Sequence, residues 1–328
     1  MALTAVIGTG AWGTTIALLL TRLGQPTVLF GRDEAKTATL ARTRRHDALS
    51  KTELPPALTI TADPNVLRHC DAYFWAVPTQ SSRAMAQRLA THIAPNAVVI
   101  SLSKGLEQGR LVRVSTLLSE ELGKRPYAVV SGPSMADECA HGQPFCLVVA
   151  GAPEATALAV ERLHSPRCRL YTSTDMIGVE LGGALKNVIA IAAGICDGMR
   201  LGDNAKAAII TRGLAEMRRL GRVLGAQDAT FAGMAGIGDL LTSCYSPLGR
   251  NRKLGQAIAA GENPQSLLDR QSSVAEGAWT CRAATLLGEQ HRIELPIASQ
   301  VAKVIWHATP VATAMENLLS RTPKEEDA

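Results

Sequence analysis

Aromatic residues are scarce in this chain, since Phe, Trp and Tyr together make up 4% of its 328 residues. Aromatic side chains are enriched in strands, so this scarcity, together with abundant alanine, favours helix-rich packing over an all-β sandwich. Hydrophobic residues still account for 46% of the sequence. At about 100–200 residues per domain, the chain is long enough for two domains with substantial cores.

Long apolar runs and paired cysteines are also missing. The best apolar stretch, Val188 to Cys196, is closed by Asp197 and falls short of the about 18 residues that span a membrane. The seven cysteines are odd in number and scattered, with no CxxC pair, which argues against a disulfide framework or a metal site. No basic segment precedes an apolar one at the start, so we expect no secretory signal. These features indicate a protein of the reducing cytoplasm, without membrane insertion and with mostly buried cysteines.

Charge is nearly balanced. The formal net charge of +5 is spread along the chain, and its longest basic cluster, 42–46, is short and not interleaved with aromatic residues. Nucleic-acid binding is therefore disfavoured, whereas phosphorylated small molecules suit the small basic excess.

A glycine pattern near the start predicts a dinucleotide site. The apolar run 5–7 meets Gly8, Gly10 and Gly13, and a helical stretch follows. Gly8 suits a tight turn, Gly10 lets the backbone approach a pyrophosphate, and Gly13 lets the helix lie against the strand.

The residues after the next strand, 26–30, do not decide between NAD and NADP as the cofactor. Asp33 lies 20 residues after Gly13, where an acid would bind the ribose 2′-hydroxyl of NAD. Its neighbour Arg32 can equally hold the 2′-phosphate of NADP, and both residues are also typical of a solvated turn.

The fold class that the pattern predicts is α/β, a Rossmann-type, largely parallel sheet domain followed by an all-α C-terminal domain. Further strands are expected at 72–77, 97–102, 127–130 and 145–150, with helices at 82–92 and 111–122. From about Ser173 the strand-like runs stop, and helices are expected at 175–198, 206–224, 252–260, 280–290 and 298–307. We place a dinucleotide-binding domain at 1–173 and a helical substrate-binding domain at 174–328, with Ser173 or Thr174 capping the first helix of the second domain.

Two lysines are candidates for chemistry on a carbonyl. Lys186 lies in a helical stretch so apolar that a charge there needs a partner or a catalytic task; the alternative interpretation is a lysine that reaches from the helix to solvent. Burial lowers the pKa of a lysine toward neutrality, where it can exchange a proton. Lys104 follows a strand end, where ligands of such sheets bind.

A glycine-rich segment around Asp239 is a third candidate. Asp239 can pair with a buried ammonium such as that of Lys186. Arg250 offers a planar fork for a phosphate, and Asn251 offers a further donor. By composition alone this segment is as typical of a surface loop.

Taken together, these segments resemble the NAD(P)-dependent glycerol-3-phosphate dehydrogenases of the bacterial, soluble type. The matching segments follow the order of the family over residues 5 to about 280: 8–13, 103–105, 131–136, 178–181, 185–187, 236–240, 250–251 and 274–277. The resemblance implies reversible reduction of dihydroxyacetone phosphate to sn-glycerol 3-phosphate for phospholipid synthesis. It implies NAD or NADP as cofactor, with NADPH slightly favoured, and a cytoplasmic homodimer.

The resemblance also assigns roles to individual residues. Lys186 would be catalytic, as the proton acceptor in oxidation and the proton donor in reduction. The substrate would be bound by Lys104, Gly132, Ser134, Lys186, Asp239, Thr242, Gly249, Arg250 and Asn251. The cofactor would be bound by Gly8, Gly10, Ala11, Trp12, Gly13, Arg32, Arg45, Lys104, Ala136, Arg250, Val274 and Glu276.

Two departures from the family concern the edge of this site. Gly249 stands where the family often has serine, so a hydrogen bond from that hydroxyl is absent. The stretch Arg44 to His46 matches the adenosine-side loop of the family poorly. Two other functions remain open, namely a reductase of the hydroxyacid or 6-phosphogluconate dehydrogenase type and a non-catalytic dinucleotide sensor.

Overall fold

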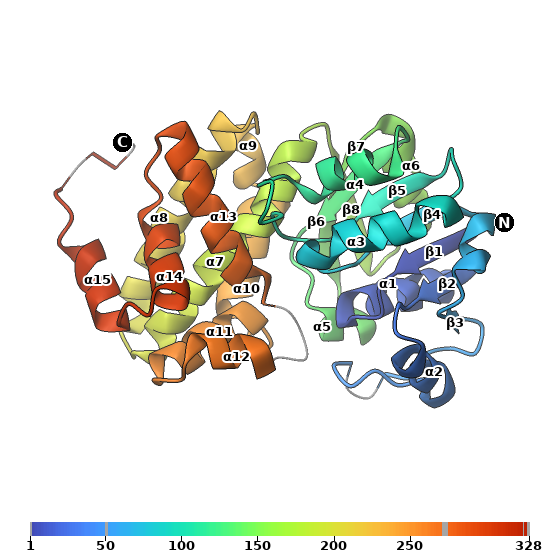
Figure 1. Cartoon of the computed structure of the whole chain (residues 1–328), viewed down its shortest axis with the longest axis horizontal. Coiled ribbons are helices and arrows are strands. Elements are labelled where there is room, and N and C mark those ends of the chain that lie inside the picture. Colours follow the sequence, from blue (N-terminus) through green and yellow to red (C-terminus); the bar gives the residue numbers. More distant parts are fainter. Residues whose placement is uncertain (1, 50–51, 271–274, 324, 327–328) are drawn as a thin grey trace.

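The structure is a computed structural model that describes residues 2–49, 52–270, 275–323 and 325–326. Its first half holds one eight-stranded sheet in the order β3-β2-β1-β4-β5-β6-β7-β8 (Figure 1). All neighbouring strands are parallel except β6 and β7. The strands are β1 Leu3–Ile7, β2 Thr27–Phe30, β3 Thr59–Thr61, β4 Cys70–Trp75, β5 Val98–Ser101, β6 Tyr127–Ser131, β7 Phe145–Gly151 and β8 Cys168–Ser173.

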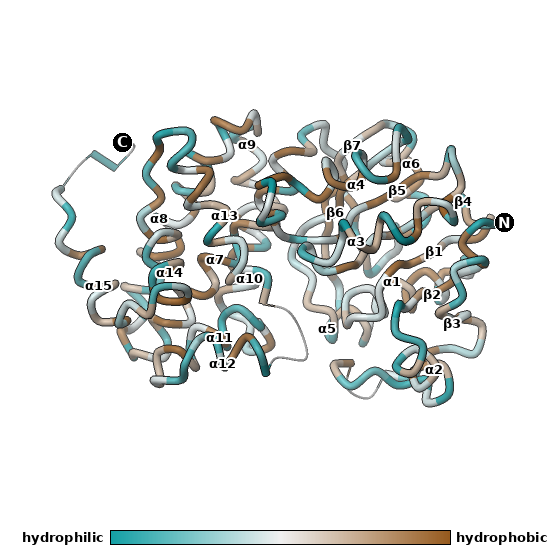
Figure 2. The backbone as a smooth tube through the Cα atoms, viewed as in Figure 1, coloured by the Kyte–Doolittle hydropathy of each residue, from teal (hydrophilic) through white to brown (hydrophobic). Residues whose placement is uncertain are grey.

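Helices cover both faces of this sheet. They are α1 Ala11–Arg22, α2 Glu34–Thr43, α3 Thr79–Leu89, α4 Val114–Leu122, α5 Ala136–Ala140 and α6 Pro153–Leu163. Side chains alternate along β1, so Val6 packs in one core with α1 and α6, while Ala5 and Ile7 pack in another with α3 and α4. The strands appear mostly as apolar segments in the interior of the domain (Figure 2).

The strand order places a ligand site beside β1. This strand pairs with β2 on one side and β4 on the other. The strands β2 and β3 are therefore added on one side of β1, and the strands from β4 onward are added on the other side. Ligands of open parallel sheets bind outside the carboxyl ends of the strands at this point. The turn after Ile7 and the segment after Trp75 meet at this edge.

The second half is helical and surrounds α7, Met176–Gly198. By length and composition α7 is apolar enough to cross a membrane, but 94% of its most apolar window is buried inside the protein, as in the core helix of a soluble protein. The other helical segments are α8 Gly202–Val223, α9 Asp228–Phe231, the π-helix Met234–Gly238, α10 Asp239–Tyr245, α11 Arg250–Ala259, α12 Pro264–Arg270, α13 Glu276–His291, α14 Pro296–Trp306 and α15 Val311–Leu319.

The predicted fold class is confirmed, with some errors in the details. The elements that had not been predicted are the strands β3 and β8 and the helices α2, α5, α6, α9, α10, α12 and α15. The prediction that Ser173 or Thr174 caps α7 is wrong. Asp175 caps it, because its carboxylate accepts the N–H of Gly178 at 2.8 Å, whereas Ser173 still belongs to β8. All seven cysteines are free, and all but Cys146 are buried.

Candidate active site

The glycine turn between β1 and α1 forms as the sequence predicts. Gly8 has a φ of +115°, and a Cβ there would lie 2.6 Å from the carbonyl oxygen of Ala76. A Cβ on Gly13 would lie 2.1 Å from the oxygen of Gly8, so α1 can pack against the turn only without a side chain there. Gly10, in contrast, faces open space and provides no side-chain cap for α1. The first amides of α1 are therefore available to an anion.

Trp12 and Glu276 carry unpaired polar atoms in this region. Trp12 Nε1 and Glu276 Oε2 are buried without a hydrogen-bond partner among the described residues. The other oxygen of Glu276 accepts the N–H of Thr79 at 2.8 Å, and burial raises the pKa of this carboxyl. Buried polar atoms are normally satisfied. Two unpaired atoms beside an open glycine turn fit a dinucleotide that supplies their partners.

The residues at the expected adenosine end are engaged in local structure. Asp33 caps α2, because its carboxylate accepts the N–H of Lys36 at 3.0 Å. Arg32 and Arg45 are exposed, and Arg45 forms a β-bridge with Glu53. His46 Nε2 lies 3.1 Å from the carbonyl oxygen of Thr9, so this loop reaches the glycine turn. Val274, a predicted cofactor contact, lies outside the described residues.

Two lysines converge on one buried carboxylate. Lys186, on α7, donates to Asp239 Oδ1 and, at 2.8 Å, to Ser243 Oγ. Lys104, after β5, donates to Asp239 Oδ2 at 2.7 Å and to the carbonyl oxygen of Gly132 at 3.1 Å. The Asp239 side chain is 2% exposed, Lys186 7% and Lys104 18%. The cluster thus joins three segments that are far apart in the sequence, namely the loop after β5, α7 and α10.

Burial sets the electrostatics of this cluster. It lowers the pKa of Lys186 to about 7; the charge of Asp239 opposes this shift and that of Lys104 adds to it. Burial alone would raise the pKa of Asp239, but the charges of Lys104 and Lys186 hold it below the usual value. Lys186 is therefore poised to give or take a proton near neutral pH, opposite a carboxylate that stays ionised.

Two glycines in α7 let the segments meet. A Cβ on Gly182 would lie 2.4 Å from the carbonyl oxygen of Ala235, in the π-helix that leads into Asp239. A Cβ on Gly183 would lie 2.6 Å from Ser131 Oγ and 3.4 Å from Lys104 Cγ. Glycine lowers helix stability, so its presence here fits the need for close approach.

The start of α11 lies beside the same helix. Asn251 donates to Asn187 Oδ1 at 2.9 Å and accepts the N–H of Gly277 at 3.0 Å, which ties α11 to α7 and α13. Arg250 is the first residue of α11 and is exposed, and Gly249 gives this helix no side-chain cap. These features leave a guanidinium and helix N–H groups available to a phosphate.

The loop after β6 completes the surroundings. Gly132 has a φ of +140°, and Ser134 Oγ donates to its carbonyl oxygen at 2.8 Å. Ala136 begins α5, and its carbonyl oxygen accepts from Thr15 Oγ1 on α1 at 3.1 Å. The loop therefore connects the Lys104 contact to the helix of the glycine turn.

Sequence reasoning missed three polar residues of the cluster. Thr242, named as a pocket residue, donates to the carbonyl oxygen of Gly238 at 3.1 Å, and its neighbour Ser243 holds Lys186 instead. Ser243 lies four residues after Asp239, on the same face of α10, a spacing that could have identified it. Ser131 donates to Asp239 at 3.3 Å, and Asn187 orients Asn251. Ser131 and Asn187 lie in the segments 131–136 and 185–187 that carry the resemblance, but neither residue had been given a role.

Comparison with known proteins gives matches over nearly the whole chain. Residues 4–157 match the family model described as NAD-dependent glycerol-3-phosphate dehydrogenase N-terminus, and residues 175–316 match the model of its C-terminus. The NAD(P)+ glycerol-3-phosphate dehydrogenase of Desulfitobacterium hafniense is 39% identical, over 99% of this chain and 93% of its own length. That of Thermobifida fusca is 42% identical, over 98% of each chain.

Solved structures are also similar to this chain. The crystal structure of glycerol-3-phosphate dehydrogenase from Coxiella burnetii is 34% identical, with a TM-score of 0.94 over 98% of this chain and 99% of its own. A ketopantoate reductase from Ralstonia eutropha is 18% identical, with a TM-score of 0.64 over 96% of this chain and 99% of its own. This second likeness extends to the fold alone.

Proposed function

Since the chain belongs to the NAD-dependent glycerol-3-phosphate dehydrogenase family, we propose that its buried lysine cluster interconverts dihydroxyacetone phosphate and sn-glycerol 3-phosphate. The chain is an oxidoreductase that uses NAD or NADP. The observation that carries the assignment of the site is the enclosure of Lys186 with Asp239, next to Lys104 at the carboxyl edge of the sheet. Neither a hydroxyacid reductase nor a cofactor sensor accounts for full-length similarity of about 40% to glycerol-3-phosphate dehydrogenases.

Lys186 is the proton-exchanging group in this proposal. When bound, the nicotinamide supplies or accepts the hydride at C2 of the substrate. In reduction Lys186 gives a proton to the C2 oxygen, and in oxidation the neutral amine takes it back. A pKa of about 7 serves both directions, since each protonation state is populated near neutral pH. Asp239 holds Lys186 and Lys104 in place by accepting from both ammonium groups.

The substrate is held between the sheet edge and the helical half. Its phosphate binds Arg250, Asn251 and the first amides of α11, where Gly249 contributes no hydroxyl. Asn251 is already oriented by Asn187 and Gly277. Lys104, Gly132, Ser134, Asp239 and Thr242 complete the substrate surroundings in this proposal.

The cofactor lies across the carboxyl ends of β1 and β4. Its pyrophosphate binds the turn Gly8 to Gly13, including Ala11, and its other contacts are Trp12, Ala136, Glu276, Arg250 and Lys104. NADPH is the preferred form, because the Asp33 carboxylate is already used in capping α2, while Arg32 and Arg45 are exposed and free to meet a 2′-phosphate. Replacing Arg32 by Gln should then raise the KM for NADPH more than the KM for NADH.

The remaining expectations concern the whole protein. The family activity supplies glycerol 3-phosphate for phospholipid synthesis. We propose that the protein is a cytoplasmic homodimer, with its dinucleotide-binding domain at 1–173 and its substrate-binding domain at 174–328. Sedimentation of the purified chain tests the dimer.

One assay tests the reaction and the cofactor together. The oxidation of NADH and of NADPH is followed by absorbance, with dihydroxyacetone phosphate as substrate and with ketopantoate and pyruvate as controls. We expect turnover with the phosphorylated ketone and a higher kcat/KM with NADPH. Cofactor binding without turnover, or turnover only with the keto acids, would contradict the proposal.

A further inference from the structure

Glu180 is a buried carboxylate on α7 that touches neither the lysines nor Asp239. Its side chain is 3% exposed and faces the start of α4 in the sheet domain. One oxygen accepts the N–H of Ser115 at 2.7 Å, and the other accepts from Ser115 Oγ at 2.6 Å and from Arg113 at 2.9 Å. A buried charge is tolerated only when it is fully paired, so these contacts specify how α7 lies on the sheet domain.

The same face of α7 continues to the lysine cluster. Glu180, Gly183 and Asn187 are spaced i, i+3 and i+7, so they form one stripe along the helix. Gly183 lies against Ser131, and Asn187 donates to the carbonyl oxygen of Lys104 at 3.1 Å. This stripe contacts the sheet domain, while Lys186 points to Asp239 and Ser243 of the helical half.

Glu180 and Asn187 also hold both ends of the segment that carries Lys104. Asn187 binds the start of this segment, 104–113, and Glu180 binds its end at Arg113. A β-bridge between Leu106 and Arg113 closes the segment on itself. A shift of α7 relative to the sheet domain would therefore move Lys104 and Lys186 with respect to each other.

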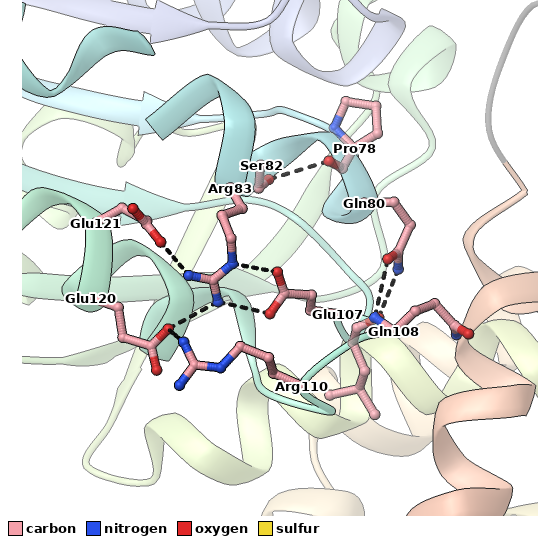
Figure 3. A network of polar contacts seen from close by, with 10 residues as sticks. Pro78, Gln80, Ser82, Arg83, Glu107, Gln108, Arg110, Glu120 and Glu121 are labelled. Atoms are coloured by element: carbon pink, nitrogen blue, oxygen red, sulfur yellow. Dashed lines mark hydrogen bonds and ion pairs between the residues drawn. The ribbon is translucent and has the colours of Figure 1, made fainter. Parts of the chain in front are cut away.

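The opposite side of the segment is fixed to α3 (Figure 3). Gln80 donates to the carbonyl oxygen of Leu106 at 2.8 Å and accepts the N–H of Gln108 at 3.1 Å. Arg83 binds both oxygens of Glu107, at 2.6 and 2.8 Å. Since this side is anchored firmly, the contact with α7 is what sets the position of Lys186 relative to Lys104.

We propose that Glu180 is a positioning residue, which places Lys186 and Lys104 on the two oxygens of Asp239 by fixing α7 on the sheet domain. The proposal rests on the function proposed above. Replacing Glu180 by Gln puts an amide NH2 group where an oxygen accepted hydrogen bonds, so the contact with α4 is weakened. Arg113, whose side chain is 25% exposed, can turn to solvent and is not left buried without a partner. Because a misplacement of about 1 Å can reduce a rate about 100-fold, we expect kcat to fall by about 10- to 100-fold.

Glu216 supplies the matched control. It is also a buried glutamate that accepts N–H groups at the start of a neighbouring helix, from Ile297 at 2.6 Å and Ala298 at 3.1 Å. Its hydrogen bonds stay within the helical half. The experiment measures kcat, the KM for dihydroxyacetone phosphate and the Kd of NADPH for the wild type, E180Q and E216Q, well below their melting temperatures.

The expected result is a reduced kcat in E180Q only, with the Kd of NADPH and the KM of the substrate within about twofold of the wild type. An unchanged kcat in E180Q overturns the proposal, and so does an equal fall in E216Q, which would indicate general loosening. If E180Q does not fold, Ser115→Ala removes the hydroxyl that donates to Glu180 and accepts from Arg113, and it should lower kcat severalfold. An unchanged kcat in folded S115A also overturns the proposal. An inactive wild type would instead refute the proposed function.

Discussion

Because the pKa of Lys186 is lowered to about 7, the rate of proton exchange should change across the neutral pH range, whereas the rate with an exposed lysine would not. A lysine with its ordinary pKa of 10.5 would remain protonated throughout the neutral range. With a pKa of about 7, the protonated fraction of Lys186 falls from about 0.9 at about pH 6 to about 0.1 at about pH 8. Reduction needs the protonated amine and oxidation needs the neutral one.

The two directions should therefore respond in opposite senses. Between about pH 6 and pH 8, kcat/KM for reduction of dihydroxyacetone phosphate should fall about tenfold, and kcat/KM for oxidation of glycerol 3-phosphate should rise about tenfold. Initial rates in both directions, measured with one cofactor and constant ionic strength, provide the profile. Profiles that stay level over this range in both directions would refute the role of Lys186.

The substrate itself titrates near this range, which calls for a control. A phosphate monoester loses its second proton at about pH 6. The variant Asp239→Asn separates the two titrations, because the Asp239 charge raises the pKa of Lys186 and its removal should lower that pKa by about 1–3 units. The inflection of the pH–rate profile that belongs to Lys186 should then move to lower pH, while the inflection that belongs to the substrate phosphate stays in place. A profile that does not move in D239N would assign the titration to the substrate.

Three further outcomes are expected. Lys186→Ala should abolish turnover and leave the Kd of NADPH, measured by fluorescence titration, nearly unchanged; substantial residual activity would count against the assignment. Arg250→Ala should raise the KM for dihydroxyacetone phosphate about 10- to 100-fold, since a charge-assisted hydrogen bond contributes about 1.5–3 kcal/mol, and an unchanged KM would contradict it. Burial raises the pKa of Glu216 from 4.5 to about 7, so its stabilising contribution is complete below about pH 4.5 and is lost as the pH rises through 7. The free energy of unfolding of the wild type, relative to E216Q, should thus fall by about 3 kcal/mol over this range in denaturant titrations; a constant difference would show that Glu216 does not titrate there.

Local patterns in the chain were sufficient to predict the elements that depend on near neighbours. The strand, turn and helix around Gly8 and Gly13 follow from spacing, because Gly13 packs on the carbonyl oxygen of Gly8 within the same strand-turn-helix segment. The contact of Gly8 with Ala76, in contrast, comes from the segment after β4. The apolar setting of Lys186 likewise indicated that its charge needs a partner, and Asp239 was named as one candidate.

Other features depended on contacts that no local pattern carries. The strand β7 runs antiparallel to β6, but the apolar pattern of a strand does not indicate whether it pairs parallel or antiparallel with its neighbour. Asp175, rather than its neighbours, caps α7, because it also accepts from Gln227 and Thr230 more than 50 residues away.

The sequence by itself therefore determined which residues are buried, which form turns and which charges need a partner, because these properties follow from short stretches of the chain. Only the tertiary structure decided that Lys104, Lys186 and Ser131 share one aspartate and that Glu180 joins α7 to α4. The pKa of Lys186 follows from that arrangement, because it reflects the burial and the charges contributed by three segments distant in the sequence.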